Sequence, residues 1–117
     1  MYTPCQARLL RIFVGESDRA DGMPLYEAIV RKARQMGMAG ATVLRGPMGF
    51  GHASLLHTAK ILRLSQDLPM VVEIVDADDK IQPFLDAIET IIGSSLVTLE
   101  TVQVIRYGPG SDGPASR

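Results

Sequence analysis

The chain has 117 residues, of which 46% are hydrophobic, and this length and composition suit one compact domain with a single core. Its formal net charge is −1, with basic and acidic residues spread along the chain, which argues against a surface for nucleic acid or for an anionic membrane. No apolar run reaches the roughly 20 residues of a spanning helix, and the first residues lack the features of a signal peptide, so we expect a cytoplasmic protein. Cys5 is the single cysteine, and it can build neither an internal disulfide nor a cysteine-based zinc cage.

The first half of the chain predicts a strand, a helix and a second strand. Residues 7–14 alternate in the manner of a strand, and both of its faces carry large apolar side chains. After the turn-like segment 15–23, Pro24 suits the first position of a helix whose apolar residues recur up to Gly37, a good residue to follow a helix end. Residues 41–44 predict a second strand that runs into the glycine-rich stretch 45–58.

The second half repeats this pattern. Residues 69–76 form an apolar run of strand length, and Asp78 or Asp79 is expected to cap a helix that ends at Gly93. Its apolar stripe comprises Ile81, Leu85, Ile88 and Ile92, and Pro83 is expected in or just beyond the first turn. Residues 97–107 predict the last strand, and residues 108–117 resemble a flexible tail.

This order of elements predicts a single domain over residues 1–107 with a ferredoxin-like α+β sandwich, βαββαβ in outline. Its antiparallel four-stranded sheet would carry two helices on one face. Leu9, Phe13 and alternate residues of 70–75 would then expose apolar surface on the uncovered face. A homo-oligomer is the simplest way to cover that face.

Five segments of the chain closely resemble the PII-like family called domain of unknown function one-ninety, and the likeness spans about residues 8–107. They are "LRIFVGESDR", "PLYEAIV", "GMAGATVLRGPMGFG", "LSQDLPMVVEIVD" and "VTLETVQVIRY". The resemblance implies a PII-like signalling protein, not an enzyme: a homotrimer that binds an adenine nucleotide (AMP, ADP or ATP) as effector in clefts between subunits, without a tightly bound cofactor. It also implies a mobile loop, here residues 52–68, that signals to a partner such as a membrane transporter or an enzyme.

The resemblance also implies which residues meet the nucleotide. In the PII pattern, the glycines that start the loop and an arginine of the last strand touch the phosphates, while Glu73 and Val75 match positions near the base and ribose. The candidate nucleotide-binding residues are therefore Arg45, Gly49, Phe50, Gly51, His52, Glu73, Val75 and Arg106. "GFGHAS" departs from the PII sequence that meets 2-oxoglutarate, and "GSSLVTLE" replaces its second phosphate loop, so AMP or ADP is expected as readily as ATP.

The residues alone leave alternatives open for this stretch. Glycines can let backbone N–H groups approach a phosphate, or they can serve a strand exit that needs positive φ. Arg11, Arg45 and Arg106 can bind an anion or form ion pairs at a subunit interface. Each reading predicts a different set of neighbours for these side chains.

The remaining polar residues favour a binding protein over an enzyme. His52 and His57 are five residues apart, which is not the spacing that puts two imidazoles on one face of a helix. A metal site would also need a third ligand from Glu73, Asp76 or another subunit, and we predict no metal site. Glu16, Asp18 and Asp21 could bind Mg²⁺ or act as acid and base, although a polar turn that complements a helix N-terminus is the simpler interpretation. No set of nucleophile, base and orienting residue can be identified. The alternative function is that of a trimeric metal-responsive protein of the CutA type.

Overall fold

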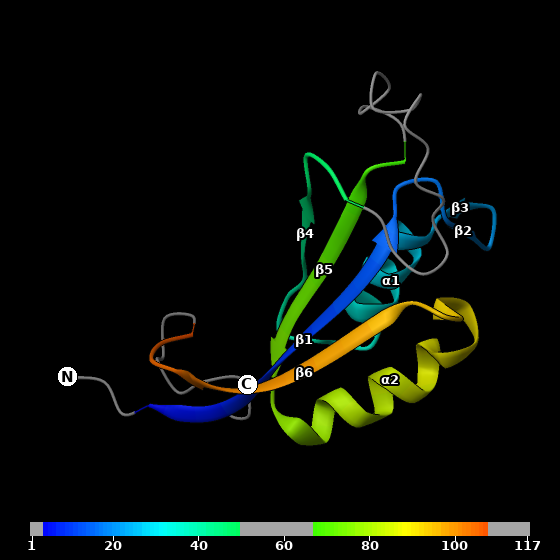
Figure 1. The fold of residues 1–117 in the computed structure, drawn as a ribbon. Coiled ribbons are helices and arrows are strands. Elements are labelled where there is room, and N and C mark those ends of the chain that lie inside the picture. The colour runs from blue at the N-terminus through cyan, green and yellow to red at the C-terminus, as the bar shows by residue number, and fades with distance from the viewer. Residues whose placement is uncertain (1–3, 50–66, 108–117) are drawn as a thin grey trace.

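The computed structural model describes residues 4–49 and 67–107, and its centre is a four-stranded antiparallel sheet (Figure 1). In spatial order the strands are β4 (Thr42–Arg45), β5 (Pro69–Asp76), β1 (Cys5–Gly15) and β6 (Leu96–Val104). The longest strand, β1, lies in the middle and pairs with β5 on one side and β6 on the other. This strand order confirms the ferredoxin-like α+β fold that the sequence predicts.

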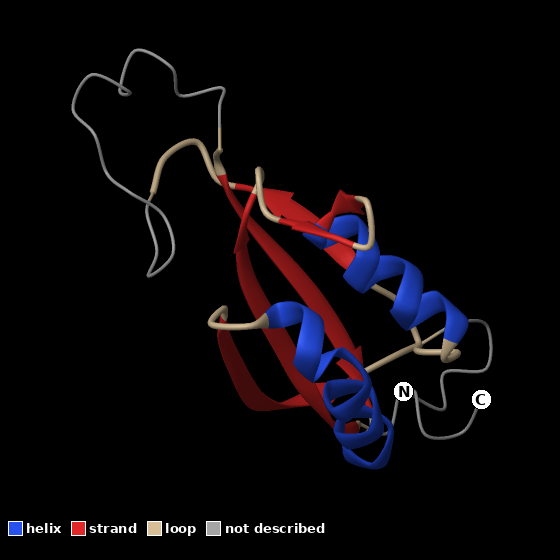
Figure 2. Ribbon diagram, turned by 90° about the vertical axis from the view of Figure 1, so that its right-hand side faces the viewer, coloured by secondary structure: helices blue, strands red, loops and turns tan. Residues whose placement is uncertain are grey.

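Both long helices lie on one face of the sheet, as Figure 2 shows: α1 (Leu25–Gln35) and α2 (Asp78–Ile92). The strand periodicity explains the arrangement, since alternate residues of β1 and β5 point toward the helices and are buried. Phe84 is fully buried in this core, although the expected stripe of α2 omits it. The buried core comprises Leu10, Ile12, Val14, Leu25, Ile29, Ala33, Met70, Val72, Ile74, Ile81, Phe84 and Ile88.

The ends of the helices agree with the sequence prediction in all but two respects. Gly37 and Gly93 follow the two helices with positive φ, but Pro24 is the N-cap of α1 and not its first residue, which is Leu25. The expected capping role of Asp78 or Asp79 is wrong, because Ala77 is the N-cap of α2 and both aspartates lie in the first turn. Carboxylates in this turn still interact favourably with the helix dipole.

A short hairpin occupies part of the segment that the sequence predicts only as a turn. It consists of β2 (Arg19–Ala20) and β3 (Met23–Pro24), joined by Asp21 and Gly22 with φ of 53° and 78°. Positive φ at both central residues is the requirement of a tight two-residue hairpin turn, and Asp-Gly is one of its preferred sequences. The Asp21-Gly22 dipeptide therefore explains why a hairpin forms here.

The uncovered face of the sheet is apolar along one row of cross-strand neighbours, as expected. Leu44 of β4, Val71 of β5, Phe13 of β1 and Leu96 of β6 lie side by side in register. Phe13, Leu44 and Leu96 are 36%, 48% and 61% exposed, large values for side chains of this size. We refer to these four residues as the apolar row.

The last strand is shorter than predicted, because β6 ends at Val104 and the next three residues lie beyond it. Neither helix in residues 4–49 and 67–107 combines the length and apolarity needed to cross a membrane. The predicted tail, 108–117, falls outside the described residues, as does the predicted signalling loop except for Asp67 and Leu68.

Candidate functional site

Arg45, one of the candidate phosphate ligands, is the last residue of β4 and forms an ion pair within the chain. Its Nη2 donates to Oε2 of Glu16 at 2.6 Å, and its side chain remains 52% exposed. Glu16 also joins the start of β5, since its backbone N–H donates to the Leu68 carbonyl at 2.8 Å and its Oε1 accepts the Leu68 N–H at 3.4 Å. Glu16 therefore connects the end of β1, the end of β4 and the start of β5.

The glycines after β4 pack against a proline ring. A Cβ on Gly46 would lie 2.9 Å from Cγ of Pro69, and one on Gly49 would lie 3.1 Å from the same atom. Gly46 also donates its N–H to the Pro69 carbonyl at 2.8 Å. Neither glycine has positive φ, so the strand-exit explanation that invoked positive φ is wrong for these two. Close approach of the backbone to Pro69 is what requires glycine here.

Two further carboxylates lie at the same end of the sheet. Asp18 accepts the N–H of Gly15 at 2.8 Å, and Asp67, which has a φ of 48°, accepts the N–H of Ser17 at 3.0 Å. Asp67 joins the turn after β1 to the start of β5, Asp18 closes the turn itself, and Glu16 joins the turn to β4. The backbone carbonyl of Asp18 also accepts the N–H of Leu25, the first residue of α1, at 2.7 Å, as expected of a polar turn that complements a helix N-terminus. Among the described residues, no group of three or more His, Cys, Asp or Glu side chains could hold a metal ion. We call Glu16, Asp18, Arg45 and Asp67 the loop-end cluster.

Glu73, expected near the nucleotide base, lies on the uncovered face and is paired with Arg11. The Nε of Arg11 donates to Oε2 of Glu73 at 2.9 Å, and its Nη1 makes a short contact with Glu100 of β6. Hydrogen bonding to Glu73 raises the pKa of Arg11 above its ordinary value, so this guanidinium stays charged at any physiological pH. Val75 lies on the same face, opposite Leu9. The two carboxylates share one arginine, and all three lie within a single chain.

The opposite end of the sheet is held by a buried carboxylate. Asp76, the last residue of β5, is 0% exposed and accepts the N–H groups of Ala39 and Ala77, each at 2.8 Å. Tyr107 donates its hydroxyl to the Ala39 carbonyl at 2.9 Å. The segment between α1 and β4 is thereby fixed to β5 and to the residues after β6. We call Ala39, Asp76, Ala77 and Tyr107 the anchor end.

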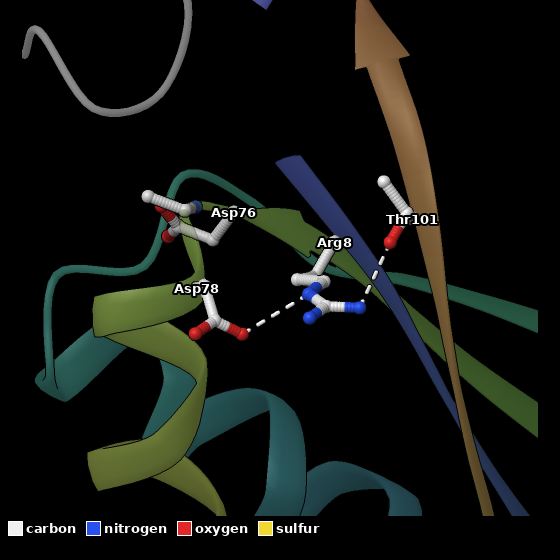
Figure 3. Close-up of polar contacts among 5 residues, drawn as sticks. Arg8, Asp76, Asp78 and Thr101 are labelled. Carbon is white, nitrogen blue, oxygen red and sulfur yellow. Dashed lines mark hydrogen bonds and ion pairs between the residues drawn. The ribbon is translucent and has the colours of Figure 1, made fainter. Parts of the chain in front are cut away.

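Arg8 extends this network across the sheet (Figure 3). From β1 its Nε donates to Oδ1 of Asp78 on α2 at 3.1 Å, and its Nη1 donates to Oγ1 of Thr101 on β6 at 2.8 Å. One planar guanidinium thus ties the first turn of a helix to two strands, which suits its fork of donors. These contacts are structural, and they occupy the side of the sheet that the helices cover.

The two candidate arginines, Arg45 and Arg106, lie at opposite ends of the sheet. Arg45 lies at the level of Val14, whereas Arg106 follows Val104, which pairs with Cys5. From position 5 to position 14 at about 3.3 Å per residue, the two levels are about 30 Å apart along β1. The two arginines of one chain therefore do not converge on one phosphate group.

The remaining candidate residues lie at the loop end, lie in the middle of the sheet, or fall outside the described residues. Gly49 belongs to the loop end, and Glu73 and Val75 lie on the uncovered face between the two ends. Phe50, Gly51 and His52 fall outside the described residues, as does His57. The sequence analysis places Glu16 in a polar turn but does not pair it with Arg45, and nothing in the local sequence singles out Asp67.

Comparison with known proteins identifies the family. A family model, DUF190, described as "Uncharacterized ACR, COG1993", matches residues 7–104. A UPF0166 protein from Aquifex aeolicus is 40% identical over 98 residues, which cover 84% of this chain and 92% of the relative. A UPF0166 protein from Methanocaldococcus jannaschii is 30% identical over 102 residues, covering 86% and 94%.

Solved structures share the fold at low sequence identity. CPII from Thiomonas intermedia, a nitrogen regulatory PII-like protein whose structures hold ADP with bicarbonate or with both AMP and bicarbonate, superposes with a TM-score of 0.67 at 16% identity, covering 91% of this chain and 95% of CPII. A putative PII-like signaling protein from Thermus thermophilus gives a TM-score of 0.61 at 13% identity, covering 87% and 92%. With its PII-like fold and a family model that matches nearly the whole described region, this chain belongs to the DUF190 family.

Proposed function

We propose that the protein is a PII-like regulator that binds an adenine nucleotide between two copies of the chain. The phosphates would meet Arg45 and the backbone at the loop end of one copy together with Arg106 of the next copy. Val75 and its neighbours on the uncovered face would lie near the base and ribose. The proposal gives the chain a binding role and no catalytic one.

The observation that carries this proposal is the separation of the two arginines. Because about 30 Å divides their levels along the sheet, one chain can offer a phosphate group only one of them. A second copy placed against the uncovered face could bring its own Arg106 to the first copy's loop end. The apolar row supplies the surface for such an assembly, and three copies around a threefold axis would bury all three faces.

The nature of the ligand is supported by fold likeness and by chemistry. CPII, which shares this fold, has been solved with ADP, AMP and bicarbonate. Guanidinium groups form charge-assisted, often bidentate, hydrogen bonds to phosphate oxygens. AMP, ADP and ATP are therefore the ligands to test. The loop over 52–68 would carry the response to a partner, a membrane transporter or an enzyme.

A thermal-shift panel with light scattering tests the proposal. A ligand that binds only the native state raises its stability, by about 2.7 kcal/mol at a hundredfold excess over Kd. We expect the melting temperature to rise with at least one of AMP, ADP and ATP, and the mass in solution to be about three chains. A folded monomer that responds to no nucleotide would contradict the proposal. A rise with divalent metals alone would support the CutA-type alternative.

A further inference from the structure

We infer that Glu16 determines how strongly the loop end binds phosphate and how strongly it discriminates among AMP, ADP and ATP. The inference rests on the proposed function. It follows from the hydrogen bond between Arg45 and Glu16, because the one arginine of the loop-end cluster is already neutralised by a carboxylate of the same chain. A phosphate that approaches Arg45 must compete with that carboxylate.

The two partners of this ion pair differ in how firmly they are held. Glu16 is 26% exposed, and both its backbone N–H and its Oε1 are bonded to Leu68. Arg45 is 52% exposed and ends a short strand at the sheet edge. The arginine can therefore reorient toward an anion, while Glu16 stays next to the place where that anion binds.

The surrounding charges make this position unfavourable for highly charged ligands. Asp18 and Asp67 bond to the same turn that carries Glu16, so the loop-end cluster holds three carboxylates and one guanidinium. Like charges at short range repel, and the repulsion grows with each phosphate group of the ligand. The site should accept AMP with little penalty and ATP with the largest penalty. Glu16 contributes most because it is the carboxylate bonded to Arg45 itself.

Glu16→Gln tests the inference with little change in shape, since the amide oxygen can still accept the Leu68 N–H. Its matched control is Glu27→Gln, which removes the comparable 2.9 Å pair between Glu27 and Arg31 on α1. Dissociation constants for AMP, ADP and ATP are measured by calorimetry at low and moderate salt, and the melting temperature is measured without ligand. Light scattering confirms that each variant keeps the assembly of the wild type.

We expect Glu16→Gln to tighten binding by about two- to threefold for AMP and by about tenfold for ATP, with ADP between them. The melting temperature should fall slightly or stay unchanged, whereas a merely structural role would weaken binding and stability together. ATP binding should also become more sensitive to salt in this variant, because the site has lost a negative charge. Glu27→Gln should alter none of these quantities.

Other outcomes separate this inference from the proposed function. If the wild type binds nucleotide and Glu16→Gln binds all three equally well or more weakly, the inference is overturned and the proposed function stands. If Arg45→Ala binds nucleotide as tightly as the wild type, the inference is also overturned, because Glu16 and phosphate then do not compete for Arg45. A wild type that binds no adenine nucleotide overturns both. If Glu16→Gln does not assemble, the inference is tested on the wild type alone. Its preference for AMP over ATP should shrink as salt is added, because salt screens the repulsion, and a preference that grows contradicts the inference.

Discussion

The two ends of the sheet are held together by different kinds of contact. At the anchor end, a carboxylate with no exposed surface accepts two backbone N–H groups at 2.8 Å. At the loop end, an arginine that is half exposed meets a carboxylate that is a quarter exposed. A buried acceptor cannot be removed without leaving its donors unpaired, whereas an exposed pair can exchange partners with water or a ligand. One end therefore maintains the fold, and the other end can respond to an anion.

The largest effect should follow from Asp76→Ala. Losing this acceptor leaves the buried N–H of Ala77 and the partly buried N–H of Ala39 without their bonds, which we expect to cost about 2–4 kcal/mol in the free energy of unfolding. Urea denaturation at one fixed chain concentration measures it. The control is Asp79→Ala, which removes an exposed carboxylate from the second residue of α2 and should cost less than about 1 kcal/mol. Equal losses would show that the buried bonds of Asp76 contribute no more than an exposed carboxylate beside them.

Arg106→Ala should weaken nucleotide binding by roughly ten- to a hundredfold, about 1.5–3 kcal/mol, because a charge-assisted contact to phosphate is lost. Folding should be largely preserved, since Arg106 is exposed beyond the end of β6. Calorimetric titration measures the affinity. Arg34→Ala on α1 removes the same charge from another exposed position and serves as the control. If Arg34→Ala lost as much nucleotide affinity as Arg106→Ala, the effect would come from the net charge of the protein and not from a contact between Arg106 and phosphate.

Gly46→Ala should destabilise the fold by about 1–2 kcal/mol, because the new Cβ would lie 2.9 Å from the ring of Pro69. Gly40→Ala is the matched control, with nothing within 4 Å of its Cβ, and should be neutral or slightly stabilising. Chemical denaturation of both variants gives the comparison. Adding Pro69→Ala to Gly46→Ala should recover part of the loss, and purely additive effects would show that the ring is not responsible.

The smallest effect on stability should come from Arg45→Ala. The pair with Glu16 is exposed to solvent, and such pairs contribute about 0.2–1 kcal/mol. The same denaturation measurement applies, and added salt should reduce the difference between variant and wild type. A loss as large as that of Asp76→Ala would mean that the loop end is as rigidly held as the anchor end.

The sequence predicts the fold well because strand and helix periodicity are local. The alternation in β1, the apolar run of β5 and the glycines after both helices each lie within one element. Residues 15–23 are predicted only as a turn, and the preference of Asp-Gly for two positive φ angles accounts for the hairpin found there. The capping prediction for α2 was wrong because the helix begins one residue earlier than expected: Ala77 is the N-cap, and its carbonyl accepts the N–H groups of Lys80 and Ile81.

The site was harder to predict because its contacts join residues far apart along the chain. Arg45 was identified as a candidate, but its partner Glu16 lies 29 residues away and Asp67 meets Ser17 across 50 residues. The glycines were interpreted by their own conformational freedom, and the reason for Gly46 lies in Pro69 instead. Local sequence gives no register between such segments, so only tertiary pairing reveals which charges neutralise one another.

A mixing experiment tests the composite site most directly. Arg45→Ala and Arg106→Ala chains are co-expressed in equal amounts, and the number of high-affinity nucleotide sites is counted by calorimetry against each variant alone. If each cleft takes Arg45 from one chain and Arg106 from the next, random trimers regain both arginines in about one quarter of their clefts. We therefore expect the mixture to show about a quarter of the wild-type sites, and each variant alone to show none. A mixture that binds no better than the separate variants would contradict a site shared between two copies of the chain.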